Sequence, residues 1–179
     1  MLFSKEDLRK LIVPLVIEQL LAVTIGMADT MMVANVGEAA VSGISLVDSL
    51  NILLIQIFSA LATGGAVVAS QYLGRQDREN ACGAAKQLVY ACAAISILVG
   101  GLAMLGGKHL LSLIFGAVEP DVMRNAETYF WLSALSYPAL AIYNAGAALF
   151  RSMSNSRVSM MTSIAMNLVN ISGNAILIY

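Results

Sequence analysis

The stretch Leu11–Val36, LIVPLVIEQLLAVTIGMADTMMVANV, decides the fold of this chain. As a helix it would extend about 39 Å, more than the ~30 Å hydrocarbon thickness of a bilayer. Its only charged residues are Glu18 and Asp29, which lie eleven positions apart and so return to nearly the same helical face. An ionised carboxylate inside such a helix costs at least ~2.5 kcal/mol unless water, a cation or a partner group stabilises it. We therefore expect Asp29 to face a polar cavity and to bind a proton or a metal cation such as Na⁺.

Glu18 lies nearer the predicted cytoplasmic end, about 16 Å from Asp29 along the helix axis. Two interpretations stay open for its carboxylate. It is either a second protonation site or a group that reaches interfacial water, and we favour the second.

The composition indicates a membrane protein. Of the 179 residues, 59% are hydrophobic and 12% are charged, whereas soluble domains carry roughly 25% charged residues. The net charge of −1 gives no indication of nucleic-acid binding. Two cysteines and a single histidine favour neither a disulfide framework nor a zinc site, and no pattern of an enzyme active site is present.

Five apolar runs are long enough to cross a bilayer as helices. We predict spans over residues 11–36, 46–73, 87–107, 127–150 and 158–179. Residues 1–179 would then form a single all-α membrane domain, a polytopic bundle of transmembrane helices. The stretch 108–118, KHLLSLIFGAV, is too short to span and either continues the third helix or lies along the interface. The last residues, NAILIY, are still apolar, so we expect the protein to continue beyond Tyr179.

The basic residues predict the orientation in a cell membrane, either a plasma membrane or a bacterial inner membrane. With the N-terminus in the cytoplasm, only Lys108 and Arg124 fall on the far side. The far-side loops would instead carry acids, among them Glu38 and Asp48. The predicted cytoplasmic side holds Lys5, Arg9, Lys10, Arg75, Arg78, Lys86, Arg151 and Arg157.

Polar side chains form a stripe along the fifth predicted span. Ser163, Asn167, Asn170 and Asn174 are spaced by four, three and four residues, which is one face of a helix. Asparagine carbonyl oxygens are neutral, hard ligands, suited to a cation whose charge one carboxylate balances. We therefore predict cation coupling at Asp29, Asn170 and Asn174.

Other polar residues in the spans have two open interpretations. They either line a cavity or hydrogen-bond between helices, where each pair is worth ~0.6–2 kcal/mol. We favour hydrogen bonding for the serines and threonines of the second span, Ser45, Ser49, Ser59 and Thr63. The candidates for lining a cavity are Glu18, Gln56, Tyr137, Asn144 and Asn167. The glycine pairs at 64–65 and 100–101 are predicted helix contacts, and Pro14 and Pro138 are predicted kinks.

Three stretches, in this order and spacing, carry a resemblance to a known family. The first runs from Pro14 to Asp29 as P-x14-D and continues TMMVANVGEAAVSG. The second is TGGAVVASQYLGRQDRENA, and the third is YPALAIYNAGAALFRSMSNSRVSMM followed by MNLVNISGN. Over nearly its whole length the chain resembles the first five helices of multidrug and toxic compound extrusion (MATE) transporters.

The resemblance implies a twelve-helix antiporter of two six-helix lobes, which exports cationic or amphipathic small molecules in exchange for H⁺ or Na⁺ and needs no other cofactor. This chain would supply five of the six helices of the N-terminal lobe, with a C-terminal lobe as its partner. Asp29 matches the family's cation-coupling acid. Some members carry N-x-x-x-D on the fifth helix, which matches Asn170 and Asn174. Because the second position is Asn here, the fifth helix lacks the carboxylate of the family's N-x-x-x-D pattern.

The sequence leaves other functions to weigh. A flippase for lipid-linked oligosaccharides, from a related superfamily, needs basic residues along its spans to meet a diphosphate, and the five apolar runs carry none. A non-transporting membrane subunit stays an alternative. An ion channel is disfavoured because no charge ring or repeated filter is present.

Overall fold

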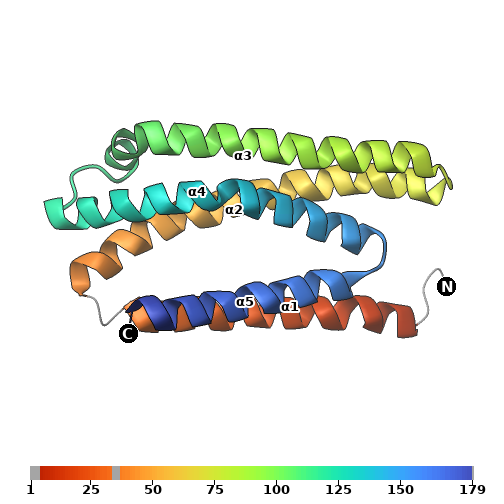
Figure 1. Ribbon diagram of the computed structural model, residues 1–179, viewed down its shortest axis with the longest axis horizontal. Helices are drawn as coiled ribbons and strands as arrows, with labels where there is room; N and C mark the ends of the chain where they lie inside the picture. Colours follow the sequence, from red (N-terminus) through yellow and green to blue (C-terminus); the bar gives the residue numbers. More distant parts are fainter. Residues whose placement is uncertain (1–4, 34–36, 179) are drawn as a thin grey trace. The chain divides into compact units, whose positions relative to one another are not determined.

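The computed structural model describes the backbone of residues 5–33 and 37–178. Within these ranges the side chains at positions 7, 25, 28–30, 32–33 and 173–178 lie outside the description. The described residues form five helices and no strand: α1 (Lys5–Val33), α2 (Glu38–Gly74), α3 (Arg78–Phe115), α4 (Pro120–Ser152) and α5 (Ser156–Ile178) (Figure 1). The predicted all-α class is therefore confirmed.

The helix ends extend beyond several predicted spans, for local chemical reasons. Asp77 caps the start of α3, because its side chain accepts a hydrogen bond from the backbone N–H of Asn80 at 3.1 Å. The helix α4 begins at Pro120, where the missing N–H is harmless because the first helical N–H groups have no partner in the helix. Pro14 lies well inside α1, so it removes a hydrogen bond from the helix interior.

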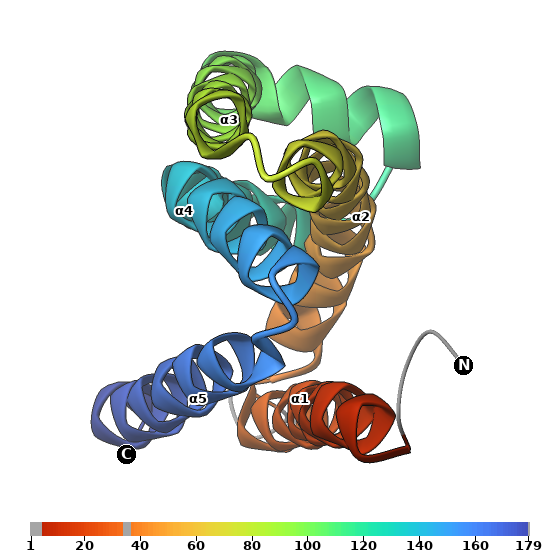
Figure 2. The same cartoon turned by 90° about the vertical axis from the view of Figure 1, so that its right-hand side faces the viewer.

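The stretch after the third predicted span continues the helix, the first of its two alternatives. The helix α3 runs on to Phe115 and ends at Gly116, whose φ of 70° is a conformation that favours glycine. The C-terminal part of α3 turns away from the rest of the helix (Figure 2). Its sequence there includes the pair Gly106 and Gly107, and paired small residues are a common cause of such bends.

The chain divides into two compact units. The two-helix unit comprises residues 1–35 and 150–179, with α1 and α5, and the three-helix unit comprises residues 36–149, with α2, α3 and most of α4. In the two-helix unit, α1 and α5 lie side by side and run in the same direction (Figures 1 and 2). That all five helices form one membrane domain stays a prediction.

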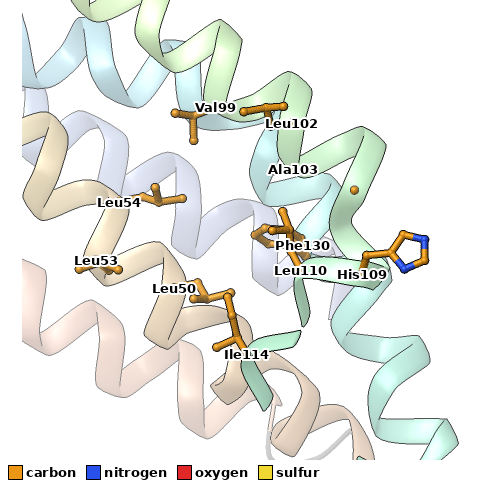
Figure 3. Close-up of a pocket in the computed structure, with 11 residues that line it drawn as sticks. Leu50, Leu53, Leu54, Val99, Leu102, Ala103, His109, Leu110, Ile114 and Phe130 are labelled. Atoms are coloured by element: carbon orange, nitrogen blue, oxygen red, sulfur yellow. The ribbon is translucent and has the colours of Figure 1, made fainter. Parts of the chain in front are cut away.

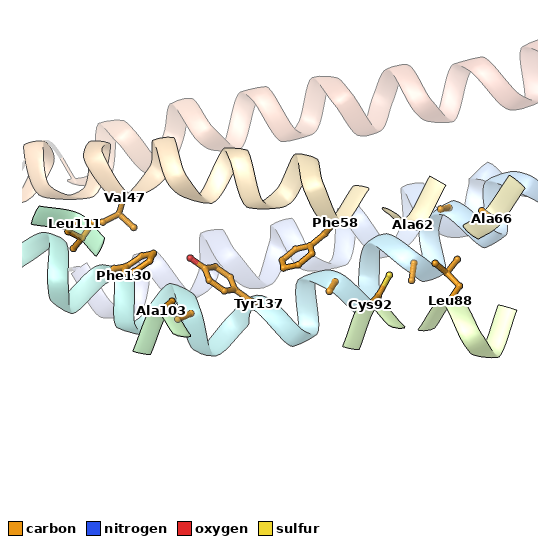
Figure 4. Packing of buried hydrophobic residues seen from close by; sticks show 14 of the residues in the cluster. Val47, Phe58, Ala62, Ala66, Leu88, Cys92, Ala103, Leu111, Phe130 and Tyr137 are labelled. Carbon is orange, nitrogen blue, oxygen red and sulfur yellow. The ribbon is translucent and has the colours of Figure 1, made fainter. Parts of the chain in front are cut away.

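The buried apolar core belongs to the three-helix unit. Phe58 of α2 and Tyr137 of α4 meet edge to face with ring centroids 6.4 Å apart, and Leu88, Cys92 and alanines extend the core along the helices (Figure 4). Small residues bring the backbones close together. A Cβ atom on Gly43 would lie 2.8 Å from the Val122 carbonyl oxygen.

The predicted glycine contacts are confirmed for one member of each pair. A Cβ on Gly65 would collide with the Leu88 side chain, and one on Gly100 would lie 3.0 Å from the Ala134 carbonyl oxygen. Gly64 and Gly101 face open space. Ala134 precedes Pro138 by four residues, so its carbonyl has lost its usual helical donor, and the glycine lets α3 approach it closely.

By length and composition, two of the described helices, α2 and α3, are apolar enough to cross a membrane. Their outer faces carry large exposed apolar side chains, such as Leu105, which is 90% exposed. Exposed apolar surface of this extent is typical of a protein that contacts lipid or a further protein surface. That α1, α4 and α5 also span a membrane stays a prediction.

Candidate functional site

The helices that carry the predicted coupling residues belong to the same unit and pack against each other. Asp29 lies in α1 and Asn170 and Asn174 in α5. The side chains of Asp29 and Asn174 lie outside the described part of the structure. Asn170 is exposed. The three-residue coupling site itself therefore stays a prediction.

A polar cluster fixes the register of these two helices. The hydroxyl of Ser159 in α5 donates to the Glu18 carboxylate in α1, with Oγ–Oε distances of 2.9 and 3.1 Å. Arg151 places its Nη1 atom 3.6 Å from Glu18 Oε1 and 3.3 Å from the Ser159 hydroxyl. The Glu18 side chain is only 18% exposed. The structure thus gives Glu18 protein partners, and our interpretation that it reaches toward interfacial water is not supported.

This register bears on the predicted site. Asp29 follows Glu18 by eleven residues, and Asn170 follows Ser159 by eleven residues. Because α1 and α5 run in the same direction, both backbones advance about 16 Å from the Glu18–Ser159 contact. The backbone of Asp29 is therefore expected at the level of Asn170.

The face of α5 that carries the asparagines is polar along most of its length. Ser156, Ser159 and Ser163 are buried, Asn167 is half-buried and Asn170 is exposed. The Asn167 amide donates to the Ser163 hydroxyl over 3.5 Å, the long end of a hydrogen bond. The part of the predicted stripe that the structure describes is thus a polar face, and it begins two turns earlier than the sequence pattern suggested.

The other cavity candidates lie in the three-helix unit. Gln56 is exposed on α2. Tyr137 is buried, and its hydroxyl donates to Asn51 Oδ1 at 2.9 Å. The Asn144 amide donates to the Leu140 carbonyl of its own helix at 2.9 Å. Two candidates, Glu18 and Asn167, therefore belong to the two-helix unit, and the other three belong to the three-helix unit.

A hydrogen-bond network between α2 and α4 was not anticipated. Besides the bond from Tyr137, the Tyr129 hydroxyl donates to Asp48 Oδ1 at 2.9 Å, and the Asn51 amide donates to the Ser133 hydroxyl at 3.2 Å. Glu38 and Asp48, which we expected in a far-side loop, both lie inside α2, and their side of the membrane stays a prediction. The spacing of these residues in the sequence could have predicted the network. Asp48 and Asn51 are three residues apart and so share a face of α2. Tyr129, Ser133 and Tyr137 are spaced by four residues and so share a face of α4.

Three of the four serines and threonines for which we favoured hydrogen bonding between helices donate within α2 instead. The hydroxyls of Ser45, Ser49 and Thr63 donate to carbonyls four residues earlier in the same helix, over 2.8, 3.1 and 2.8 Å. Such local bonds satisfy a hydroxyl in an apolar environment without a neighbouring helix. These bonds therefore give no indication of contact with another helix.

The three-helix unit also contains an apolar pocket of about 470 Å³. Leucines 50, 54 and 110, Val99 and Phe130 line it, whereas the ring of His109 at its edge points away from these side chains (Figure 3). Apart from that histidine the lining carries no titratable side chain. The pocket could therefore hold an apolar ligand, but its apolar lining supplies no side chain that could catalyse a reaction. No group of three or more His, Cys, Asp or Glu side chains that could hold a metal occurs in the described part of the chain.

Comparison with known proteins gives consistent results. Residues 14–176 match the MatE family. The chain is 28% identical over 168 residues to the uncharacterized transporter YisQ of Bacillus subtilis (strain 168), which covers 93% of this chain and 36% of YisQ.

The fold resembles that of a MOP superfamily transporter from Pyrococcus furiosus Vc1 (DSM3638), with a TM-score of 0.90 and 16% identity. That protein's binding pocket is described as having reverse polarity, which suggests a different function for it. The match covers 98% of this chain and 38% of that one, so the chain spans little more than a third of the length of either relative. The family match covers most of the sequence, and the chain belongs to the MatE family.

Proposed function

We propose that the chain acts within a membrane antiporter that exports cationic or amphipathic small molecules in exchange for H⁺ or Na⁺. Family membership and the uncharacterized transporter from Bacillus subtilis support transport. The observation that supports the coupling site is the register of α1 and α5 at the Glu18–Ser159 contact, from which we expect the Asp29 backbone at the level of Asn170. Asp29 supplies the negative charge, and Asn170 and Asn174 supply neutral oxygen ligands.

The mechanism follows from the cost of a charge in an apolar helix. Binding of a proton or a sodium ion neutralises Asp29 and removes a penalty of at least ~2.5 kcal/mol. A cationic substrate neutralises the same carboxylate, so the coupling ion and the substrate compete for one site. The ion-bound form and the substrate-bound form favour different conformations if the contacts between α1 and α5 differ between the two forms. Exchange then needs no covalent step.

Transport by the full-length protein in vesicles tests this proposal. An imposed H⁺ or Na⁺ gradient should drive saturable movement of a fluorescent cation such as ethidium, and Asp29→Asn should abolish this ion-driven transport. Asn170→Ala should raise the apparent activation constant for the coupling ion about fivefold, as loss of a ligand worth about 1 kcal/mol predicts. The matched control is Glu79→Gln, which removes one exposed carboxylate from the first turn of α3.

Unchanged transport and unchanged ion dependence in Asp29→Asn would refute the coupling role. Transport of lipid-linked oligosaccharide in place of the cation would favour the flippase. A protein that moves neither compound under either gradient would be the non-transporting subunit.

A further inference from the structure

A groove with basic and apolar walls lies in the two-helix unit, away from the predicted coupling site. We call it the basic groove; its lining includes Arg9, Lys10, Val13, Ile17, Arg157 and Met160. It has a volume of about 370 Å³ and lies between the first half of α1 and the first turns of α5. The α1 members are spaced by three or four residues, so one face of that helix forms a continuous wall.

The charge of the groove is positive. Lys10 pairs with Glu6 at 3.3 Å, and both side chains are well exposed. Arg9 and Arg157 form no ion pair with any side chain that the structure describes. The start of α5 at Ser156 adds the positive end of a helix dipole on the same side. Two guanidinium groups from different helices are therefore available to an anion, and their forked geometry suits phosphate oxygens.

The other wall of the groove is apolar. The side chains of Val13 and Ile17 are 44% and 38% exposed, and Met160 is half-buried beside them. A free inorganic anion would gain nothing from this wall. A molecule with an anionic head and a hydrocarbon chain would use both features, with its head at the arginines and its chain along α1 toward the more apolar part of the helix.

We propose that the basic groove binds one anionic phospholipid, with the headgroup phosphate between Arg9 and Arg157 and an acyl chain along Val13 and Ile17. The arginines lie near the N-terminal ends of α1 and α5, on the side that the distribution of basic residues predicts to be cytoplasmic, where such lipids attract basic segments. The lipid packs against α1 and α5 together and stabilises their pairing at the end opposite to Asp29. This proposal does not depend on antiport, because lipid binding is measured directly.

The test measures lipid bound to the detergent-solubilised full-length protein by native mass spectrometry. Phosphatidylglycerol is titrated against phosphatidylcholine, which has the same chains but no net charge. The double variant Arg9→Gln/Arg157→Gln should raise the apparent Kd for phosphatidylglycerol about 30-fold, the loss expected for two basic contacts with an anionic lipid. The control Arg75→Gln/Arg78→Gln removes the same charge from exposed positions in the three-helix unit and should change the Kd less than threefold.

A second pair of measurements separates the lipid from a free phosphate. Val13→Ser/Ile17→Ser keeps the arginines and should weaken binding of phosphatidylglycerol several-fold, and inorganic phosphate should not displace the lipid. An equal rise in the apparent Kd for phosphatidylglycerol in the two double arginine variants would show that the lipid is attracted by surface charge in general, and it would overturn the proposal. So would equal binding of the two lipids, or full displacement by phosphate. Circular dichroism confirms that each variant is folded.

Discussion

The two units of the molecule bury different chemistry. In the three-helix unit the buried residues are mostly apolar, and Phe58, Leu111 and a series of alanines pack closely between α2, α3 and α4. In the two-helix unit, among the side chains that the structure describes, the buried residues are Pro14 and the serines 156, 159 and 163. The three-helix unit is therefore held mainly by packing, with hydrogen bonds between α2 and α4, and the two-helix unit has a polar interface that contains an ion pair.

This difference bears on function. Close-packed apolar surfaces have few alternative arrangements of similar energy, because any shift opens cavities or causes overlaps. A polar interface can exchange its partners when a charge is neutralised, since hydroxyls and amides donate or accept according to their surroundings. We therefore expect changes linked to ion binding within the two-helix unit, with the packing inside the three-helix unit as the fixed part.

Gly43→Ala should destabilise the three-helix unit by about 1–3 kcal/mol, because the new methyl group would lie 2.8 and 2.9 Å from backbone atoms of α4. The control in the same helix is Gly64→Ala, which faces open space and should stabilise by up to ~1 kcal/mol through helix propensity. Heating in the presence of a thiol-reactive dye reports the buried Cys92 once the exposed Cys82 is replaced by serine. Equal melting temperatures for the two alanine variants would contradict close packing at Gly43.

The pair of Glu18 and Arg151 should contribute about 1–2 kcal/mol of coupling free energy, since both side chains are largely withdrawn from water. A double-mutant cycle with Glu18→Gln and Arg151→Gln, followed by thermal unfolding in detergent, measures it. The exposed pair of Glu6 and Lys10 in the same unit is the control and should give less than ~0.5 kcal/mol. A coupling free energy no larger than that of the control pair would show that the ion pair does not determine the register of α1 and α5.

Tyr137→Phe should cost about 1 kcal/mol, because it removes the hydroxyl that donates to Asn51 in the interior of the three-helix unit. Tyr90→Phe is the matched control, since Tyr90 is 72% exposed on α3 and should tolerate the change. Thermal unfolding, followed by the reaction of the dye with the Cys92 thiol, measures the stability of both variants. A neutral result at Tyr137 would mean that packing alone holds α2 and α4 together.

The smallest effect concerns the cap of α3. Hydrogen bonds from the side chain and the backbone of Asn80 lower the pKa of Asp77 below its ordinary value of 3.8. Its contribution is fully present above that ordinary value and is lost as the pH falls through the lower, folded pKa. Asp77→Asn should therefore flatten the acid side of the melting-temperature profile of the three-helix unit slightly. Asp121→Asn serves as the control, and identical profiles for the wild type and Asp77→Asn would contradict the cap.

The sequence by itself determined the number of helices and their approximate extents. Apolar runs longer than a bilayer is thick have few other stable structures, so the five predicted spans correspond to five helices. Local signals could also be found in the sequence: Asp77 before α3, Pro120 at the start of α4, and the helical spacing of the serine and asparagine stripe. These features depend on residues close together in the chain, and local geometry is regular enough to be predicted from them.

Only the tertiary structure decided which polar groups meet. Glu18 precedes Ser159 by 141 residues and Tyr137 follows Asn51 by 86 residues, and no spacing rule relates helices that are so far apart in the chain. The sequence could not distinguish a hydroxyl that bonds its own backbone, such as Ser49, from one that reaches another helix, such as Ser159. That choice depends on how closely the neighbouring helix approaches, and the approach is set by packing over the whole length of both helices.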